Sequence, residues 1–251
     1  MKKVVLIAGL LVSTSVLGAQ ISLAVNTENA TTNGTVTMEK PTAGDSETTD
    51  PVDPNNPDNP FVPENPNPGT PEEGTDGLIT IDQAPDLDFG TLTLGKAQKA
   101  YAALQSGTSA GASTEVQNFV QVTDKSGNYA GWTLSVKRTE FVEGTDANKT
   151  LAGTTLRFKN ASLATTTDNP TAAPSTFVGA GTAGVEIPVD SKIDLVKAGA
   201  SEGIGTWIYK MGADAAEGEQ SVELDIPLAQ YTVGNYTSTL TWTITDAPQS
   251  N

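Results

Sequence analysis

The residues best suited to binding chemistry are three tryptophans, Trp132, Trp207 and Trp242. An exposed indole ring can stack on a flat apolar surface such as the face of a sugar, whereas a buried one fills a core. Trp132 and Trp242 each lie in a stretch that alternates apolar and small polar residues, which favours burial of both rings. Trp207, with Tyr209 on the same strand face, is an equally good candidate for stacking on sugars.

Residues suited to catalysis or metal binding are sparse. The chain has no Cys and no His, which excludes Ser–His and Cys–His nucleophile pairs and the commonest metal ligand. Asp82, Asp86 and Asp88 are close enough in sequence to suggest a calcium site, but they lack EF-hand spacing and we interpret them as solvated carboxylates. A carboxylate pair for glycoside hydrolysis would meet only in three dimensions and stays an alternative. We therefore expect no enzyme, no catalytic residue, no metal and no cofactor.

Short strands must position these residues. Trp132, Leu134 and Val136 share one strand face, and the alternation repeats near the end of the chain, in the period of two that is typical of half-buried strands. The segments predicted as strands are 78–82, 91–95, 116–123, 129–138, 154–159, 184–189, 205–210, 220–226 and 237–245. Residues 96–104 are permissive for a short helix or turn. Without a regular βαβ rhythm, the pattern predicts an all-β fold, an antiparallel β-sandwich or partly closed barrel that is immunoglobulin-like or similar.

The N-terminal part of the chain has a different composition. Residues 1–24 combine two lysines, an apolar run too short to span a bilayer and a small-residue cleavage motif, which predicts a secretory signal peptide. Residues 25–77 are rich in proline and carboxylates, and we predict a disordered acidic stalk or linker there. Residues 78–251 are the predicted folded domain. The net charge of −16 argues against nucleic acid as a partner.

The order and spacing of the two tryptophan stretches resemble those of the WxL domain family of Gram-positive surface proteins. The first motif is Gly131-Trp132-Thr133-Leu134, and the closing motif is Thr241-Trp242-Thr243-Ile244-Thr245-Asp246-Ala247-Pro248. Residues 78–90 look like the opening of the family's domain, so the resemblance covers residues 78–248. Ile244 stands where the family more often has Leu, which keeps the volume and the apolar character.

The resemblance implies a secreted protein at the cell surface that binds the peptidoglycan of the cell wall without a covalent link. It also implies, as an additional partner, a membrane-anchored protein that binds the domain. The candidate wall-binding or motif residues are Trp132, Leu134, Trp242, Ile244 and Trp207, although the resemblance assigns no binding role to Trp207. We expect that the protein does not span the membrane after signal cleavage. Two alternatives stay open: an interaction protein or adhesin held through the membrane-anchored partner, and a secreted carbohydrate-active enzyme.

Overall fold

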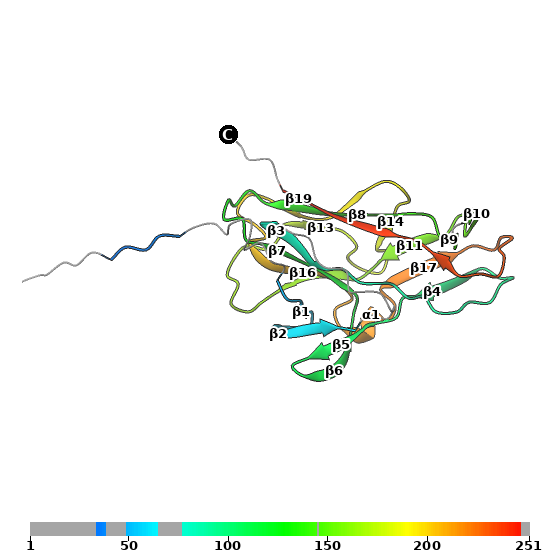
Figure 1. Cartoon of the computed structure of the whole chain (residues 1–251), viewed down its shortest axis with the longest axis horizontal. Helices are drawn as coiled ribbons and strands as arrows, with labels where there is room; N and C mark the ends of the chain where they lie inside the picture. Colours follow the sequence, from blue (N-terminus) through cyan, green and yellow to red (C-terminus); the bar gives the residue numbers. More distant parts are fainter. Residues whose placement is uncertain (1–33, 39–48, 65–76, 145, 247–251) are drawn as a thin grey trace, which may run out of the picture. The chain divides into compact units, whose positions relative to one another are not determined.

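The computed structural model of the protein describes residues 34–38, 49–64, 77–144 and 146–246 (Figure 1). The chain divides into two units, Met1–Met38 and Glu39–Asn251. Of the first unit only residues 34–38 are described; they are exposed and have no regular secondary structure. The predicted signal peptide, residues 1–24, lies outside the described residues. No helix in the described part of the chain is long and apolar enough to cross a membrane.

The second unit is all-β, as predicted, and its strands pair antiparallel in several open sheets; none of the described sheets closes into a barrel (Figure 1). One sheet has the strand order β12 (Ala161–Thr165), β16 (Gly205–Met211), β7 (Phe119–Asp124), β3 (Ile79–Gln83). A second sheet has the order β13 (Thr176–Phe177), β15 (Ile193–Ala198), β8 (Trp132–Arg138), β19 (Leu240–Asp246). A third sheet has the order β14 (Val185–Ile187), β11 (Thr155–Phe158), β17 (Val222–Ile226), β4 (Gln98–Tyr101). A fourth has the order β1 (Val52–Asp53), β2 (Asn56–Pro63), β5 (Gln105–Ser109), β6 (Ala112–Val116). A small sheet joins β10 (Asp146–Thr150), β9 (Val142–Glu143) and β18 (Tyr236–Thr237), and a single helical turn, α1, covers Ala215–Gly218.

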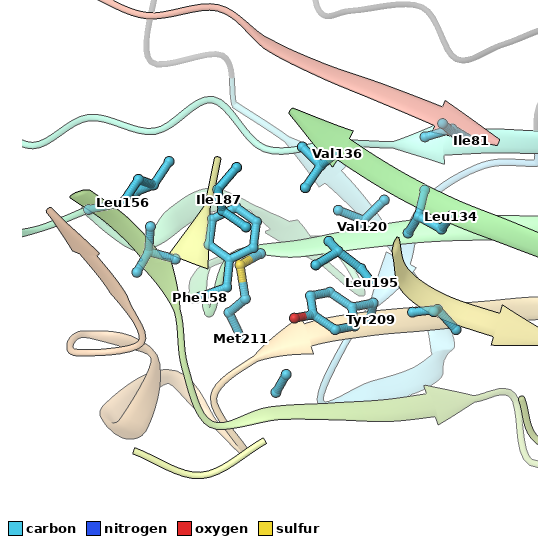
Figure 2. Packing of buried hydrophobic residues seen from close by; sticks show 14 of the residues in the cluster. Ile81, Val120, Leu134, Val136, Leu156, Phe158, Ile187, Leu195, Tyr209 and Met211 are labelled. Atoms are coloured by element: carbon cyan, nitrogen blue, oxygen red, sulfur yellow. The ribbon is translucent and has the colours of Figure 1, made fainter. Parts of the chain in front are cut away.

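The main core forms where the apolar faces of the sheets meet (Figure 2). Strand β8 contributes Leu134 and Val136, β16 contributes Tyr209 and Met211, and β11 contributes Phe158, each at most 2 % exposed. Neighbouring residues on these strands point the other way, as the period of two requires. Burying one large apolar side chain contributes about 1.5–3 kcal/mol, so this alternation is what holds the sheets against one another.

Residues 49–64 differ most from the sequence prediction. They were expected to belong to a disordered stalk, yet they form β1 and β2 and pack on the domain. The Phe61 side chain is 1 % exposed, and its ring meets that of Phe119 edge to face with centroids 5.7 Å apart. Gly107 makes the space, because a Cβ there would lie 2.4 Å from the Phe61 ring. The prediction of disorder is therefore wrong for residues 49–64, and the remainder of the predicted stalk, apart from residues 34–38 and 77, lies outside the described residues.

Polar contacts also hold this segment, which we call the strap (residues 49–64). The Val52 amide donates to Gln121 Oε1 at 2.9 Å, and the Thr49 amide donates to Asp82 Oδ1 at 3.0 Å. Proline lacks the amide donor that a continuous ladder needs, and β2 pairs with β5 only over its last three residues, from Phe61. One buried ring and a few directed hydrogen bonds thus order a segment whose average composition is that of a linker.

Two further segments correct the secondary-structure prediction. Residues 98–101, inside the stretch that was predicted to be helix or turn, form strand β4. Ala100 lies opposite Leu224 of β17 and is 6 % exposed, so pairing with a neighbouring strand overrides a weak helix propensity. Residues 91–95 form no strand.

Candidate functional site

The two tryptophan motifs lie side by side. Strands β8 and β19 pair antiparallel, with Leu134 opposite Ile244 and Val136 opposite Trp242. Directly opposed residues of an antiparallel pair project from the same face of the sheet. The motif residues therefore form one apolar face that packs into the main core, although more than a hundred residues separate the two motifs in sequence.

Trp132 is a core residue. Its side chain is 1 % exposed, and its indole Nε1 donates to the Gly203 carbonyl at 2.9 Å. Gly203 has a φ of +68°, and a Cβ at this position would lie 2.8 Å from the same indole nitrogen. A glycine is thus required both for the backbone conformation and for the approach of the ring. In this structure the ring of Trp132 offers no face to a sugar.

The other motif residues differ in exposure. Leu134 is fully buried, whereas Trp242 and Ile244 are half-buried. The Trp242 ring stacks on that of Phe158, with centroids 5.9 Å apart and planes 10° apart. Trp207 is 6 % exposed, and its Nε1 donates to the Ile204 carbonyl at 3.1 Å. Of the three tryptophans, only Trp242 therefore keeps part of its surface accessible among the described residues.

Tyr209, which was predicted to share a strand face with Trp207, is also buried. The Tyr209 hydroxyl donates to the Val178 carbonyl at 3.0 Å. Burial raises the pKa of the Tyr209 phenol, which keeps it a neutral donor. Neither Trp207 nor Tyr209 is placed to stack on a ligand from outside, so their shared strand face is part of the core.

The residues between the motif positions form the opposite, outward face of the same two strands. Their register brings hydroxyl side chains together in cross-strand pairs, a feature that the sequence reading did not use although the alternation contains it. The outward residues on β8 and β19 are Thr133, Ser135, Lys137, Thr241, Thr243 and Thr245, with Thr133 opposite Thr245, Ser135 opposite Thr243 and Lys137 opposite Thr241. Thr241 and Thr245 are exposed, Thr133, Lys137 and Thr243 are half-buried, and Ser135 is buried at this face.

Strand β15 extends this face with charged groups. Lys197 lies opposite Thr133, and its Nζ is 2.8 Å from Asp194 Oδ2. The Ser135 hydroxyl donates to Asp194 Oδ1 at 2.8 Å. Hydrogen bonds from Lys197 and from Ser135 hold the pKa of the Asp194 carboxyl below its ordinary value, with a smaller contribution from the charge of nearby Lys192. We call the outward residues of β8, β19 and the adjoining part of β15, with Lys192, the hydroxyl–lysine face.

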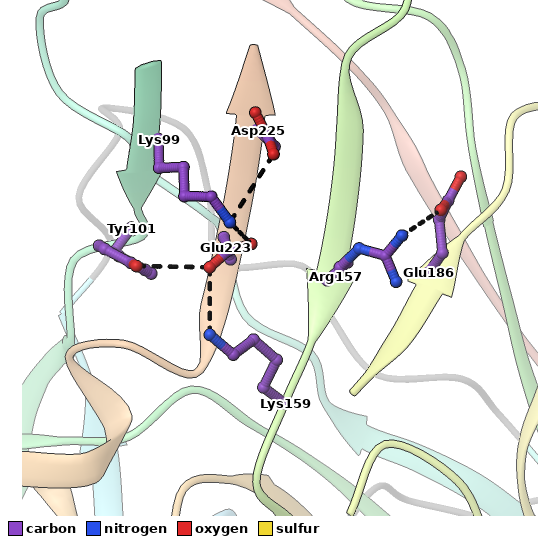
Figure 3. Close-up of polar contacts among 7 residues, drawn as sticks. All are labelled: Lys99, Tyr101, Arg157, Lys159, Glu186, Glu223 and Asp225. Carbon is purple, nitrogen blue, oxygen red and sulfur yellow. Dashed lines mark hydrogen bonds and ion pairs between the residues drawn. The ribbon is translucent and has the colours of Figure 1, made fainter. Parts of the chain in front are cut away.

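The outward face of the sheet β14-β11-β17-β4 has a different charge pattern (Figure 3). Glu223 accepts from Lys99 at 2.7 Å and from Lys159 at 3.1 Å, and Arg157 pairs with Glu186 at 2.8 Å. Burial opposes ionisation of Glu223, but the two lysines leave its pKa below the ordinary value. The charges on this face neutralise one another within the protein.

The three aspartates considered for calcium do not converge. Asp86 and Asp88 are exposed, as expected of solvated carboxylates. Asp82 is 5 % exposed instead, and it accepts hydrogen bonds from the Thr49 amide, Thr80, Gln121 and Thr123. Its role is to anchor the strap to the sheet. The described residues contain no group of three or more acidic side chains arranged to hold a metal ion.

A family model described as WxL domain surface cell wall-binding matches residues 25–248. The match includes both motif strands, the strap and the hydroxyl–lysine face. No curated protein and no solved structure matches the chain.

Proposed function

The chain belongs to the WxL domain surface cell wall-binding family, and we propose that it is secreted and attaches to peptidoglycan without a covalent link. Family membership places it at the cell surface, in the cell wall. The attachment mode and the polymer are the proposal. The observation that carries it is the family match over residues 25–248, which spans almost all of the described structure.

The fold supports attachment to a polymer. An extended ligand such as a wall glycan binds most simply along an exposed sheet surface, and the domain has such a surface next to its family motifs. The candidate side chains of Trp132, Leu134 and Trp207 are buried, so they stabilise the strands from the core and do not contact a ligand. Trp242 and Ile244, which are half-buried, are the only two of the candidate residues with surface left for a ligand.

Export is the other requirement of a wall protein. Residues 1–24 have the composition of a secretory signal, and the family match begins at residue 25, directly after the predicted cleavage site. This agreement supports the proposed division into a signal peptide and a mature wall-binding protein. We propose a binding role and not a catalytic one for the mature protein.

Sedimentation tests the proposal. The purified full chain is mixed with peptidoglycan sacculi stripped of proteins and of phosphate-containing wall polymers, and the bound fraction is measured after centrifugation. We expect saturable binding, with intact protein released by hot detergent because no covalent bond has formed. Binding that appears only when a membrane-anchored partner protein is added would support the alternative of indirect retention. Release of soluble wall fragments over time would support an enzyme.

A further inference from the structure

We propose that the hydroxyl–lysine face is the surface on which peptidoglycan lies, with its sugars over the Thr side chains and its peptide-stem carboxylates at the lysines. This inference deepens the proposed function and rests on it. It moves the contact surface from the tryptophans of the motif to the residues between them. The residues that the argument uses are Thr133, Lys137, Lys192, Lys197, Thr241 and Thr245.

The first support is that packing in the core holds the strands of this face in fixed positions. Each outward residue on β8 and β19 has a buried or half-buried residue as its chain neighbour. Trp132 is held by Gly203, and Trp242 by its stack on Phe158, so the strands that present the face are fixed from behind. A ligand would then bind to positions that are already ordered and would cost little side-chain and backbone entropy on binding.

The second support is the chemistry of the exposed groups. Half-buried Thr133 and exposed Thr245 are a cross-strand pair, and Thr241, also exposed, lies four residues before Thr245 on the same face of β19. Directly opposed side chains in an antiparallel pair have Cβ atoms about 5 Å apart, and rows repeat along a strand at about 7 Å. Each hydroxyl both donates and accepts, which fits the hydroxyl and N-acetyl groups spaced along a glycan chain.

The third support is charge. Among the described residues, Lys137 and Lys192 make no ion pair, and Lys197 shares Asp194 with Ser135. The face therefore carries a local excess of positive charge, although the chain as a whole has a net charge of −16. The lysines of the sheet β14-β11-β17-β4 are instead neutralised by Glu223 and Asp225. Lysines that make no ion pair with a described residue are available to pair with the carboxylates of a ligand, and they orient an anionic ligand against the overall repulsion.

Phosphate-bearing wall polymers would meet the same lysines. The hydroxyl rows favour peptidoglycan, because they offer neutral hydrogen bonds to its sugar rings and not only ion pairs at its charged groups. The use of stripped sacculi separates the two ligands. Binding to intact walls that is lost on stripped sacculi would overturn the assignment to peptidoglycan.

Two sets of substitutions test the face in the full chain. The first is Lys137→Glu with Lys192→Glu, which reverses the charges of the two lysines that make no ion pair with a described residue. The second is Thr133→Val, Thr241→Val and Thr245→Val, which removes hydroxyls but keeps β-branched side chains of the same shape. Lys96→Glu is the control for reversing one lysine elsewhere, because Lys96 is exposed, lies outside the face and makes no ion pair with a described residue. These sites are exposed or half-buried, and thermal unfolding of each variant verifies that the fold is kept.

We expect each set to weaken binding to stripped sacculi about tenfold or more in apparent Kd, and the control to bind like the wild type. The deficit of the lysine variant should shrink as salt rises from about 0.05 M to 0.5 M, because screening removes both the attraction and the new repulsion. The deficit of the threonine variant should not depend on salt. A purely structural defect would not produce this difference.

Wild-type affinity in either set, or an equal loss in Lys96→Glu, would overturn the inference while leaving the proposed function intact. A wild-type protein that does not sediment with sacculi at all would overturn the proposed function, and the inference with it.

Discussion

Replacing Trp132 by Phe separates the structural from the binding interpretation of the family motif. The Trp132 indole is 1 % exposed and donates through Nε1 to the Gly203 carbonyl. Phenylalanine keeps an aromatic ring but has no donor, so the Gly203 carbonyl loses its partner in the core. Leaving a buried acceptor unsatisfied costs about 1–3 kcal/mol, and the smaller ring removes packing of about 1 kcal/mol more.

The free energy of unfolding should therefore fall by about 2–4 kcal/mol. For a domain of this size, that corresponds to a decrease in Tm of about 5–15 °C. Thermal and urea unfolding followed by circular dichroism would measure it. The same preparations are then tested for retention on stripped sacculi at a temperature well below both transitions, where we expect the variant to bind like the wild type.

Trp242→Phe is the matched control on the paired strand. Trp242 is half-buried, and its indole makes no hydrogen bond to a described residue. Phenylalanine at this position can still stack on Phe158, so we expect a loss of less than about 1 kcal/mol. A Trp132→Phe variant that melts like the wild type but no longer binds sacculi would refute the structural interpretation, because the ring would then contribute to the ligand and not to the core.

Three further substitutions probe the strap and a surface loop. Phe61→Ala should lower the free energy of unfolding by about 3–5 kcal/mol in urea titrations, because the Phe61 ring is buried against Phe119. It should also make residues 49–64 cleavable by added protease. Unchanged stability would show that this segment is a linker that does not stabilise the fold. Asp82→Ala should cost about 2–4 kcal/mol in the same assay, because Thr49, Gln121 and Thr123 lose a buried acceptor; a neutral result would contradict the anchoring role. Hydrogen bonds, first from the Gly199 amide and then from Ser175, hold the pKa of Glu202 below its ordinary value. The stability that Glu202 contributes is therefore present above the unfolded-state pKa and is lost as pH falls through the folded-state pKa. The Tm difference between the wild type and Glu202→Gln should therefore be constant near neutral pH and shrink below about pH 4, and a difference that grows on acidification would reverse the assigned sign.

Local patterns in the sequence determined the fold class and most of the strands around the motifs. The alternation in residues 129–138 and 237–245 predicts two strands with one apolar face each, and the structure has β8 and β19 there. Such predictions succeed because a period of two follows from strand geometry alone and needs no knowledge of the neighbours. The family resemblance likewise depends only on the order and spacing of the motifs, and the family match confirms it.

The tertiary structure decided which segments meet. That β8 pairs with β19, and that the threonines between the motif residues thereby gather on one exposed face, depends on contacts between residues far apart in sequence. The order of the strap was not predicted for the same reason. Its average composition is that of a linker, and only the structure shows that the Phe61 ring packs against the backbone at Gly107. Asp82 looked like a solvated acid because the donors that surround it come from other strands and from the strap. Periodicity reports which side of a strand is apolar, but the choice of partner strand is set by packing and hydrogen bonding across the whole domain.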